Sequence, residues 1–243
     1  MPIGVIINAL SVVIGGILGT VLGHKLTQDF KTQINLVFGI CSMGMGISTI
    51  VKMENMPAVI FALVIGTGIG LWIHLGAGIN KGAVGMQKGI SKFVKSSNSK
   101  LSEEEFTNTL VTIIVLFCAS GTGIYGSIVS GMSGDHTILI SKSILDLFTA
   151  AIFACNLGAV VSLIAAPQLI IFGILFFGAN IIFPLTTPVM INDFKACGGF
   201  LMLATGFRMV KLKNFPTADM IPAMIIVMPL SYIWMTYILP FVS

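Results

Sequence analysis

Charged residues are scarce in this chain: Asp, Glu, Lys and Arg make up 9% of its 243 residues, whereas soluble globular proteins carry roughly 25%. The mean hydropathy is +1.01. So few charges cannot cover the surface of a water-soluble domain of this length. The scarcity therefore excludes a soluble globular fold and predicts that lipid covers most of the surface.

Paired cysteines, clustered histidines and enzyme motifs are also missing. The four cysteines lie singly in apolar runs without a CxxC motif, and the three histidines are scattered. This pattern argues against disulfides and a zinc site, and we expect neither a metal nor a cofactor. HExxH, GxSxG and Walker A motifs are absent, and Asp146 is the one acid deep within an apolar run. We therefore expect no enzymatic activity and no nucleic-acid binding.

The sequence does have long apolar segments. A membrane-spanning helix needs ~20 predominantly apolar residues. Eight segments approach this length and predict an all-α polytopic membrane protein, with a single transmembrane domain over residues 1–243. The predicted spans are residues 3–22, 33–51, 57–76, 107–130, 139–165, 168–187, 190–209 and 219–240.

The basic residues of the loops predict the orientation. With eight spans and both termini outside, ten loop Lys or Arg residues face the cytoplasm, and Lys52 and Lys195 face outward. This distribution follows the positive-inside rule. Segment 77–105 is then cytoplasmic. Its lysines favour either an amphipathic helix on the anionic leaflet or a basic loop, and both alternatives stay open.

Two similar stretches indicate an internal repeat. Gly39 and Gly46 precede KMENMP, and Gly199 and Gly206 precede KLKNFP. Five predicted spans separate the ends of the two stretches, so the copies have opposite orientations and spans 1–3 mirror spans 6–8. A chance match in apolar sequence is the alternative. Inverted repeats are typical of secondary transporters.

Most of the polar chemistry within apolar sequence lies between Ser120 and Asp146. The glycines of SGTGIYG weaken a helix by ~1 kcal/mol each relative to alanine, so we expect a span that is interrupted or locally unwound near Gly121–Gly126. A continuous helix with a glycine face is the alternative. Lys142 and Asp146, four residues apart, share a helical face. They are either a snorkelling lysine with its counter-ion or a site for a solute or ion.

Polar residues of four predicted spans lie at a similar depth. At ~1.5 Å per helical residue, Asn8, Thr122, Asp146 and Asn180 are about 8–12 Å below the outer surface. Such residues can line one cavity, while an interhelical hydrogen bond explains either asparagine alone. The candidate substrate-binding residues are Asn8, Ser120, Thr122, Ser127, Lys142, Asp146 and Asn180.

Several motifs resemble a known family. They are INAL-x-VVIGG-x-LG near the start, LFC-x-x-G, GSI-x-x-G and GD in the middle, KS-x-LD at residues 142–146, and the Lys-Asn-Pro run before the last span. These are similar to the YdfK/YqgA-like family of bacterial integral membrane proteins, a domain of unknown function. The resemblance covers essentially the whole chain and implies the bacterial inner membrane.

Together these features favour a secondary transporter of a small solute, for which an anionic group would suit Lys142, with or without a coupling ion. A channel or pore is one alternative. A non-transporting membrane scaffold or regulatory protein is another. A homo-oligomer, most simply a homodimer, is expected because eight short spans give little protein to shield a moving polar site from lipid.

Overall fold

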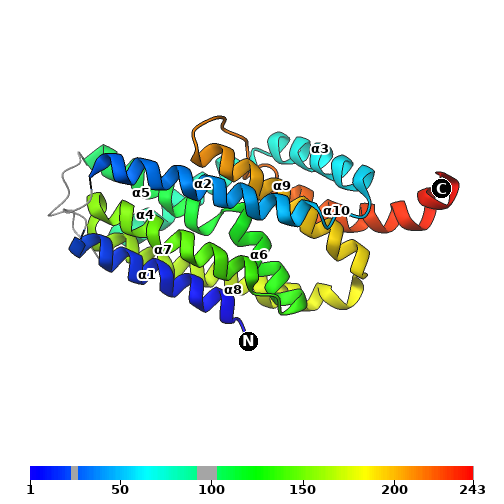
Figure 1. Cartoon of the computed structure of the whole chain (residues 1–243), viewed down its shortest axis with the longest axis horizontal. Helices are drawn as coiled ribbons and strands as arrows, with labels where there is room; N and C mark the ends of the chain where they lie inside the picture. The colour runs from blue at the N-terminus through cyan, green and yellow to red at the C-terminus, as the bar shows by residue number, and fades with distance from the viewer. Residues whose placement is uncertain (23–26, 92–102, 243) are drawn as a thin grey trace. The chain divides into compact units, whose positions relative to one another are not determined.

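The computed structural model describes residues 1–22, 27–91 and 103–242, in which every regular element is a helix. Figure 1 shows their arrangement. The α-helices are α1 (Ile3–Leu22), α2 (Gln28–Ile50), α3 (Met56–Trp72), α4 (Leu75–Ser91), α5 (Glu103–Cys118), α6 (Gly121–Ser133), α7 (Thr137–Leu157), α8 (Ala165–Ile182), α9 (Pro188–Met209), α10 (Ile221–Ile233) and α11 (Leu239–Val242). The 3-10 helices η2 (Gly158–Ile164) and η3 (Phe183–Leu185) flank α8, and the π-helix η4 (Trp234–Ile238) follows α10.

A helix lies over each of the eight predicted spans. Five helical stretches are long and apolar enough to cross a membrane, and the bent pair α3 and α4 raises this number to six. Helix α9 is not among them, because its first half carries Asn192, Asp193 and Lys195. The described residues thus form an all-helical protein with five to six candidate spans, and the count of eight stays a prediction.

Part of the predicted cytoplasmic segment 77–105 is helical. Helix α4 covers it as far as Ser91, and α5 begins at Glu103. The residues between them, 92–102, lie outside the described residues. The choice between an amphipathic helix and a basic loop on the membrane therefore stays a prediction.

The chain divides into two compact units. Unit 1 comprises Met1–Asn35 and Gly78–Asn180, and unit 2 comprises Leu36–Ala77 and Ile181–Ser243. In unit 1, α1 lies alongside α7 and η2 (Figure 1).

Glycines on α1 allow its close approach to α7. A Cβ atom on Gly15 would lie 2.1 Å from the Leu147 carbonyl oxygen, and one on Gly19 would lie 2.0 Å from the Ala151 carbonyl oxygen. Larger side chains would separate the two backbones. The small residues of the first predicted span therefore pack inside unit 1, as small residues do between membrane helices.

Unit 2 is built on a crossing of α2 and α9. A Cβ on Gly46 would lie 2.7 Å from the Gly199 carbonyl oxygen, and a Cβ on Gly199 would lie 2.7 Å from the Gly46 carbonyl oxygen. Gly39 and Gly206 face each other in the same reciprocal way, at 3.1 and 2.7 Å. The four glycines singled out in the sequence therefore contact one another in two pairs.

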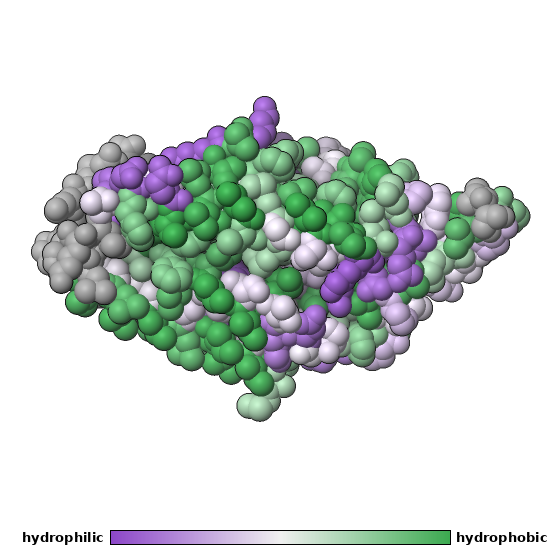
Figure 2. All heavy atoms as spheres, in the orientation of Figure 1, coloured by the Kyte–Doolittle hydropathy of each residue, from purple (hydrophilic) through white to green (hydrophobic). Residues whose placement is uncertain are grey.

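Large apolar side chains remain exposed on both units. Leu10 of α1 is 52% exposed, Trp72 of α3 82% and Ile174 of α8 67%. Figure 2 shows apolar residues spread over the visible face, with polar residues in smaller groups. Soluble proteins rarely expose apolar surface so widely. This surface is suited to lipid.

Candidate functional site

The segment predicted as the fourth span is interrupted. Helix α5 ends at Cys118 and α6 begins at Gly121, within one candidate span, Thr109–Ser133. Ser120 is the N-cap of α6, and its hydroxyl oxygen accepts a hydrogen bond from the Gly123 N–H at 3.2 Å, as capping serines do. An interruption is present, but it lies at residues 119–120, just before the glycine cluster, and Gly121–Gly126 are helical. Its position follows from Ser120, which provides a good start for the second helix.

Two helix ends of opposite partial charge flank this break. At the start of α6 the N–H groups of Gly121 and Thr122 donate to no partner among the described residues, and both residues are buried. At the end of α5 the Phe117 carbonyl oxygen accepts a hydrogen bond from Gln168 Nε2 at 3.3 Å. Because helix N-termini attract anions and C-termini attract cations, the break can serve ligands of either sign.

A buried polar cluster in unit 1, here called the Asp146 cluster, consists of Asn8, Lys142, Asp146 and Gln168. Asp146 Oδ2 accepts hydrogen bonds from Asn8 Nδ2 at 2.8 Å and from Gln168 Nε2 at 3.2 Å, and Lys142 Nζ forms an ion pair with the same oxygen. Gln168 Nε2 also donates to Asn8 Oδ1 at 2.9 Å. Helices α1, α7 and α8 hold these side chains, which are 0–7% exposed.

Two acceptor atoms of the Asp146 cluster remain unused. Gln168 Oε1 is buried and has no hydrogen-bond partner among the described residues. The contacts of Asp146 all fall on Oδ2, so Oδ1 accepts no hydrogen bond from the same set of residues. Gln168 Oε1 is the buried acceptor of the two, and a buried acceptor without a donor costs roughly 1–3 kcal/mol. Native structures rarely keep one without a water, ion or ligand. The cluster therefore lacks a donor or a cation.

Lys142 points into unit 1. Its side chain is 4% exposed, and Nζ lies 5.8 Å from the ring centroids of both Phe117 and Phe172. A Cβ on Gly123 would lie 3.0 Å from Lys142 Cε and 2.2 Å from Phe172 Cζ. Glycine at this position therefore brings the start of α6 against the lysine. The aromatic faces stabilise the ammonium, and its burial argues against the snorkelling alternative.

Three further predicted residues lie in the first turns of α6. Ser120 forms the cap, and Thr122 is 4% exposed. Ser127 is fully buried and donates a hydrogen bond to the Gly123 carbonyl oxygen of its own helix at 2.7 Å. Ser127 thus supports the glycine that contacts Lys142.

Asn180 does not join the Asp146 cluster. It is exposed on α8, and its Nδ2 donates to the Phe176 carbonyl oxygen of the same helix at 3.3 Å. Gln168, on α8 as well, contributes the amide that the sequence analysis missed. Gln168 stood at the predicted start of a span, but η2 and the first turn of α8 place it inside unit 1. A single glutamine within a long apolar run was the available signal.

Unit 2 holds a second buried acid, Asp193 of α9, which is 0% exposed. Its Oδ1 accepts the backbone N–H groups of Glu54 and Asn55 at 2.9 and 2.8 Å. Its Oδ2 accepts Asn55 Nδ2 at 2.9 Å and Ser231 Oγ at 2.6 Å. Asp193 is therefore a second buried acid, and the statement that Asp146 alone lies well inside a span stays a prediction about membrane depth. In the sequence, Asp193 lies near the start of a predicted span, where an acid is easily solvated. In the structure, the start of α3 packs against it and buries it.

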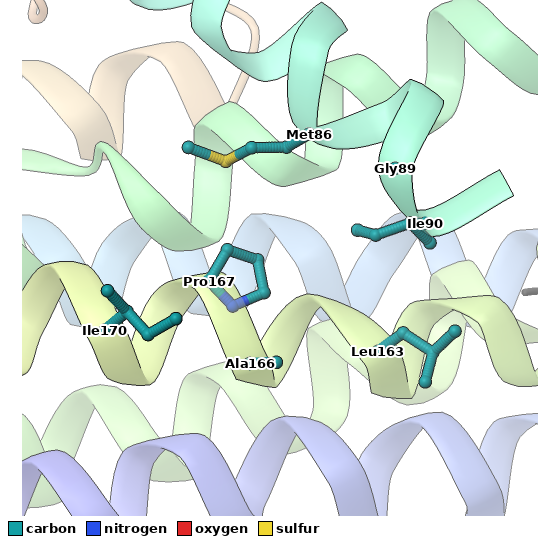
Figure 3. A pocket seen from close by; sticks show the side chains of 7 residues that line it. All are labelled: Met86, Gly89, Ile90, Leu163, Ala166, Pro167 and Ile170. Carbon is teal, nitrogen blue, oxygen red and sulfur yellow. The ribbon is translucent and has the colours of Figure 1, made fainter. Parts of the chain in front are cut away.

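An apolar cavity of about 410 Å³ also lies in unit 1, between α4 and the η2–α8 segment. In Figure 3, Met86 and Ile90 of α4 face Leu163, Pro167 and Ile170 across it. All its lining residues are apolar, so it cannot orient a polar solute. The described residues also hold no group of three His, Cys, Asp or Glu suited to a metal. The Asp146 cluster and the adjoining break form the candidate functional site.

Comparison with known proteins identifies the family. Residues 3–232 match the family described as "Protein of unknown function (DUF554)". The chain is 46% identical over 234 residues to "Uncharacterized protein YqgA" of Escherichia coli K12, covering 96% of this chain and 98% of that protein. It is 24% identical over 226 residues to "Uncharacterized membrane protein YdfK" of Bacillus subtilis 168, covering 92% and 93%. No solved structure matches significantly. The resemblance seen in the sequence motifs is confirmed.

Proposed function

Because this chain belongs to the DUF554 family, whose description names no activity, we propose its function from the site: a secondary transporter of a small solute across the bacterial inner membrane. The observation that carries this proposal is a buried Lys142–Asp146 ion pair beside a broken helix. Secondary transporters use discontinuous helices to bind charged solutes and coupling ions within the membrane.

A structural role alone does not account well for the ion pair. Removing two charges from water costs several kcal/mol per ion, and apolar residues of similar volume are often as stable. Ionisable residues inside membrane segments are rare and usually mark solute or ion pathways. Lys142 and Asp146 are both buried within α7, which carries no other charged residue. We therefore assign the pair to the transport pathway.

The solute class follows from the groups around Lys142. The lysine ammonium and the N–H groups of Gly121 and Thr122 are donors that suit a carboxylate or phosphate. Asn8 and Gln168 hold Asp146, which orients Lys142 when no solute is bound. Ser120 and Ser127 fix the start of α6. The solute is therefore a small molecule with an anionic group.

The proposed topology has eight spans, both termini outside and an inverted repeat. The reciprocal contacts of the α2 and α9 glycines support the repeat, because Gly199 and Gly206 follow Gly39 and Gly46 by the same interval of 160 residues. Cysteines introduced by Glu54→Cys and Lys213→Cys, labelled with a membrane-impermeant reagent after removal of the native cysteines, should react from opposite sides. Equal labelling from one side would exclude the inverted repeat.

We also propose a homodimer in the bilayer. The glycines of α1 pack on α7, and Gly66 and Gly70 of α3 pack on Ala223 and Asp219. These small-residue faces are therefore occupied within their own units, so a dimer contact would use other exposed apolar surface. Native mass spectrometry from mild detergent should show twice the chain mass, and a monomer would refute the dimer.

A channel and a non-transporting scaffold are the competing functions, and flux separates them. The full chain is reconstituted into proteoliposomes, and entry of small radiolabelled carboxylates and phosphate is measured by counterflow against the same internal compound. A transporter accelerates exchange of at least one compound in a saturable way, and Asp146→Asn abolishes the exchange while Asp29→Asn on the exposed face of α2 retains it. Unsaturable flux indicates a pore. Absence of flux for every anion in the panel contradicts anion transport.

A further inference from the structure

We propose that the Asp146 cluster binds a sodium ion through Asp146 Oδ1 and Gln168 Oε1, and that this ion releases Lys142 to bind the anionic solute. The inference rests on the proposed function and names its coupling ion. It begins from the two acceptor atoms that lack a donor among the described residues.

The donor set is suited to a hard monovalent cation. Carboxylate, amide and backbone carbonyl oxygens prefer hard cations over transition metals. A site for Ca²⁺ or Mg²⁺ typically includes more than one charged or phosphate oxygen, whereas Asp146 is the one carboxylate here. The Phe117 carbonyl oxygen at the end of α5 accepts a hydrogen bond from Gln168 and so adjoins the Asp146 cluster. The negative end of a half-helix favours a cation at this point.

Few other charges can balance a bound ion. Helices α1, α6 and α8 carry no Asp, Glu, Lys or Arg, and α7 carries only Lys142 and Asp146. The Cys118 thiol on α5 lies within electrostatic range of both. Lys142 and Asp146 therefore set the net charge of the site, which is zero when both are ionised.

This charge balance couples the ion to the solute. Sodium alone would leave the buried site with one excess positive charge, and an anionic solute alone would leave one excess negative charge. Both together keep it neutral, so each should strengthen binding of the other by the same factor. Lys142 needs to move only from Asp146 toward the start of α6, which Gly123 already places against its Cε.

The test uses the purified full chain in detergent at constant chloride and ionic strength, with sodium replacing choline. The midpoint of thermal unfolding should rise with sodium in a saturable way, because a ligand that binds only the folded state stabilises it. Gln168→Met removes the orphan carbonyl with similar side-chain volume and should abolish the rise. Gln33→Met, on the exposed face of α2, should keep it. If the Asp146→Asn variant does not fold, the response of Gln168→Met to sodium still tests the proposed ion site.

The Lys142→Met variant should change the sodium dissociation constant in one direction only. Removing the ammonium that competes for Asp146 should lower the sodium dissociation constant by roughly tenfold or more, while Lys81→Met on the exposed face of α4 should leave it unchanged. A merely structural lysine would weaken sodium binding or leave it unaltered when removed. Either of those results would overturn the proposal.

Three other outcomes also overturn it. One is an unfolding midpoint that does not respond to sodium, which would mean that Gln168 Oε1 takes a water. Another is an equal rise with potassium, which would refute selective sodium binding. The third is solute flux that does not depend on sodium, which refutes the coupling but leaves transport intact. Conversely, saturable sodium binding without any flux supports the ion site and refutes the proposed transport.

Discussion

Asp146 in unit 1 and Asp193 in unit 2 are both buried carboxylates in apolar helices, yet their surroundings differ. Asp193 accepts four hydrogen bonds spread over both oxygens. Asp146 pairs with a lysine, and within the described part of the chain all its contacts fall on one oxygen. It also binds the amide of Gln168, whose oxygen has no donor among the same residues. One carboxylate is saturated by neutral donors, and the other is incompletely coordinated.

The difference separates a structural anchor from a binding site. Two donors to Asp193 are backbone N–H groups at the start of α3, where the helix dipole favours a negative charge. Ser231 attaches α10 to the same carboxylate. Asp193 therefore joins α3, α9 and α10, and has no capacity left for a ligand. Asp146 keeps such capacity and sits at a helix break.

Removing the Asp193 carboxylate should have the largest effect on stability. Asp193→Ala leaves several buried donors without an acceptor and should lower the free energy of unfolding by about 3–4 kcal/mol. Denaturant unfolding in detergent measures this loss. Asp29→Ala, at an exposed position of α2, should change the same quantity by less than about 0.5 kcal/mol. A wild-type unfolding curve for Asp193→Ala would show that the anchor contributes nothing.

Asp146→Asn should have the second largest effect on stability, because it leaves Lys142 without its counter-ion. An unpaired buried ammonium is costly, so this variant should lose about 3 kcal/mol. Adding Lys142→Met removes the charge and should restore the free energy of unfolding to within about 1 kcal/mol of the wild-type value. The double-mutant cycle is read from the same unfolding curves. If the second substitution adds to the loss instead, the two side chains are not an energetic pair.

Substitutions at the glycine contacts between α2 and α9 should have a smaller effect on stability, and α2 also offers a matched control position. Gly46→Ala places a methyl group 2.7 Å from the Gly199 carbonyl oxygen and should cost about 1–3 kcal/mol through overpacking. Gly44→Ala, on the same helix with no atom within 4 Å of its Cβ, should gain up to about 1 kcal/mol from helix propensity. Thermal unfolding of both variants gives the comparison. A similar change for the two would contradict the close approach of α2 and α9.

The caps of α6 and α9 should give the smallest effects, and they differ between the units. Ser120→Ala and Thr187→Ala each remove a hydroxyl acceptor from a helix start and should each cost about 0.5–2 kcal/mol. Only Ser120→Ala should also weaken solute-dependent stabilisation, because α6 begins at the site. Loss of that ligand response in Thr187→Ala as well would mean that the response reports global stability.

Local sequence was enough to predict much of this fold. The apolar segments anticipated the helices, and SGTGIYG anticipated the break before Gly121 because glycine and a capping serine act within one turn. The four-residue spacing placed Lys142 and Asp146 on one face. Their ion pair is a property of α7 alone, so it needed no knowledge of the packing.

The rest depends on contacts distant in sequence. Gln168 joins Asn8 across 160 residues, and Asp193 meets Asn55 across 138. No periodicity in either helix specifies those partners. Depth alone also grouped Asn180 with Asp146, but Asn180 follows Gln168 by twelve residues on α8, about 18 Å further along the helix axis and about 120° around it. Because Gln168 is the α8 residue that contacts Asp146, the estimated depth of Asn180 did not identify the right position on this helix.

The most direct test of the central claim measures anion counterflow per folded molecule for Asp146→Asn with Lys142→Met and for Asp193→Ala, side by side in proteoliposomes. Folded protein is quantified by size-exclusion chromatography before reconstitution. We expect the Asp146 and Lys142 double variant to be folded and inactive, while whatever fraction of Asp193→Ala folds exchanges solute at the wild-type rate. Wild-type exchange by the double variant would contradict the assignment of the transport site to the Asp146 cluster.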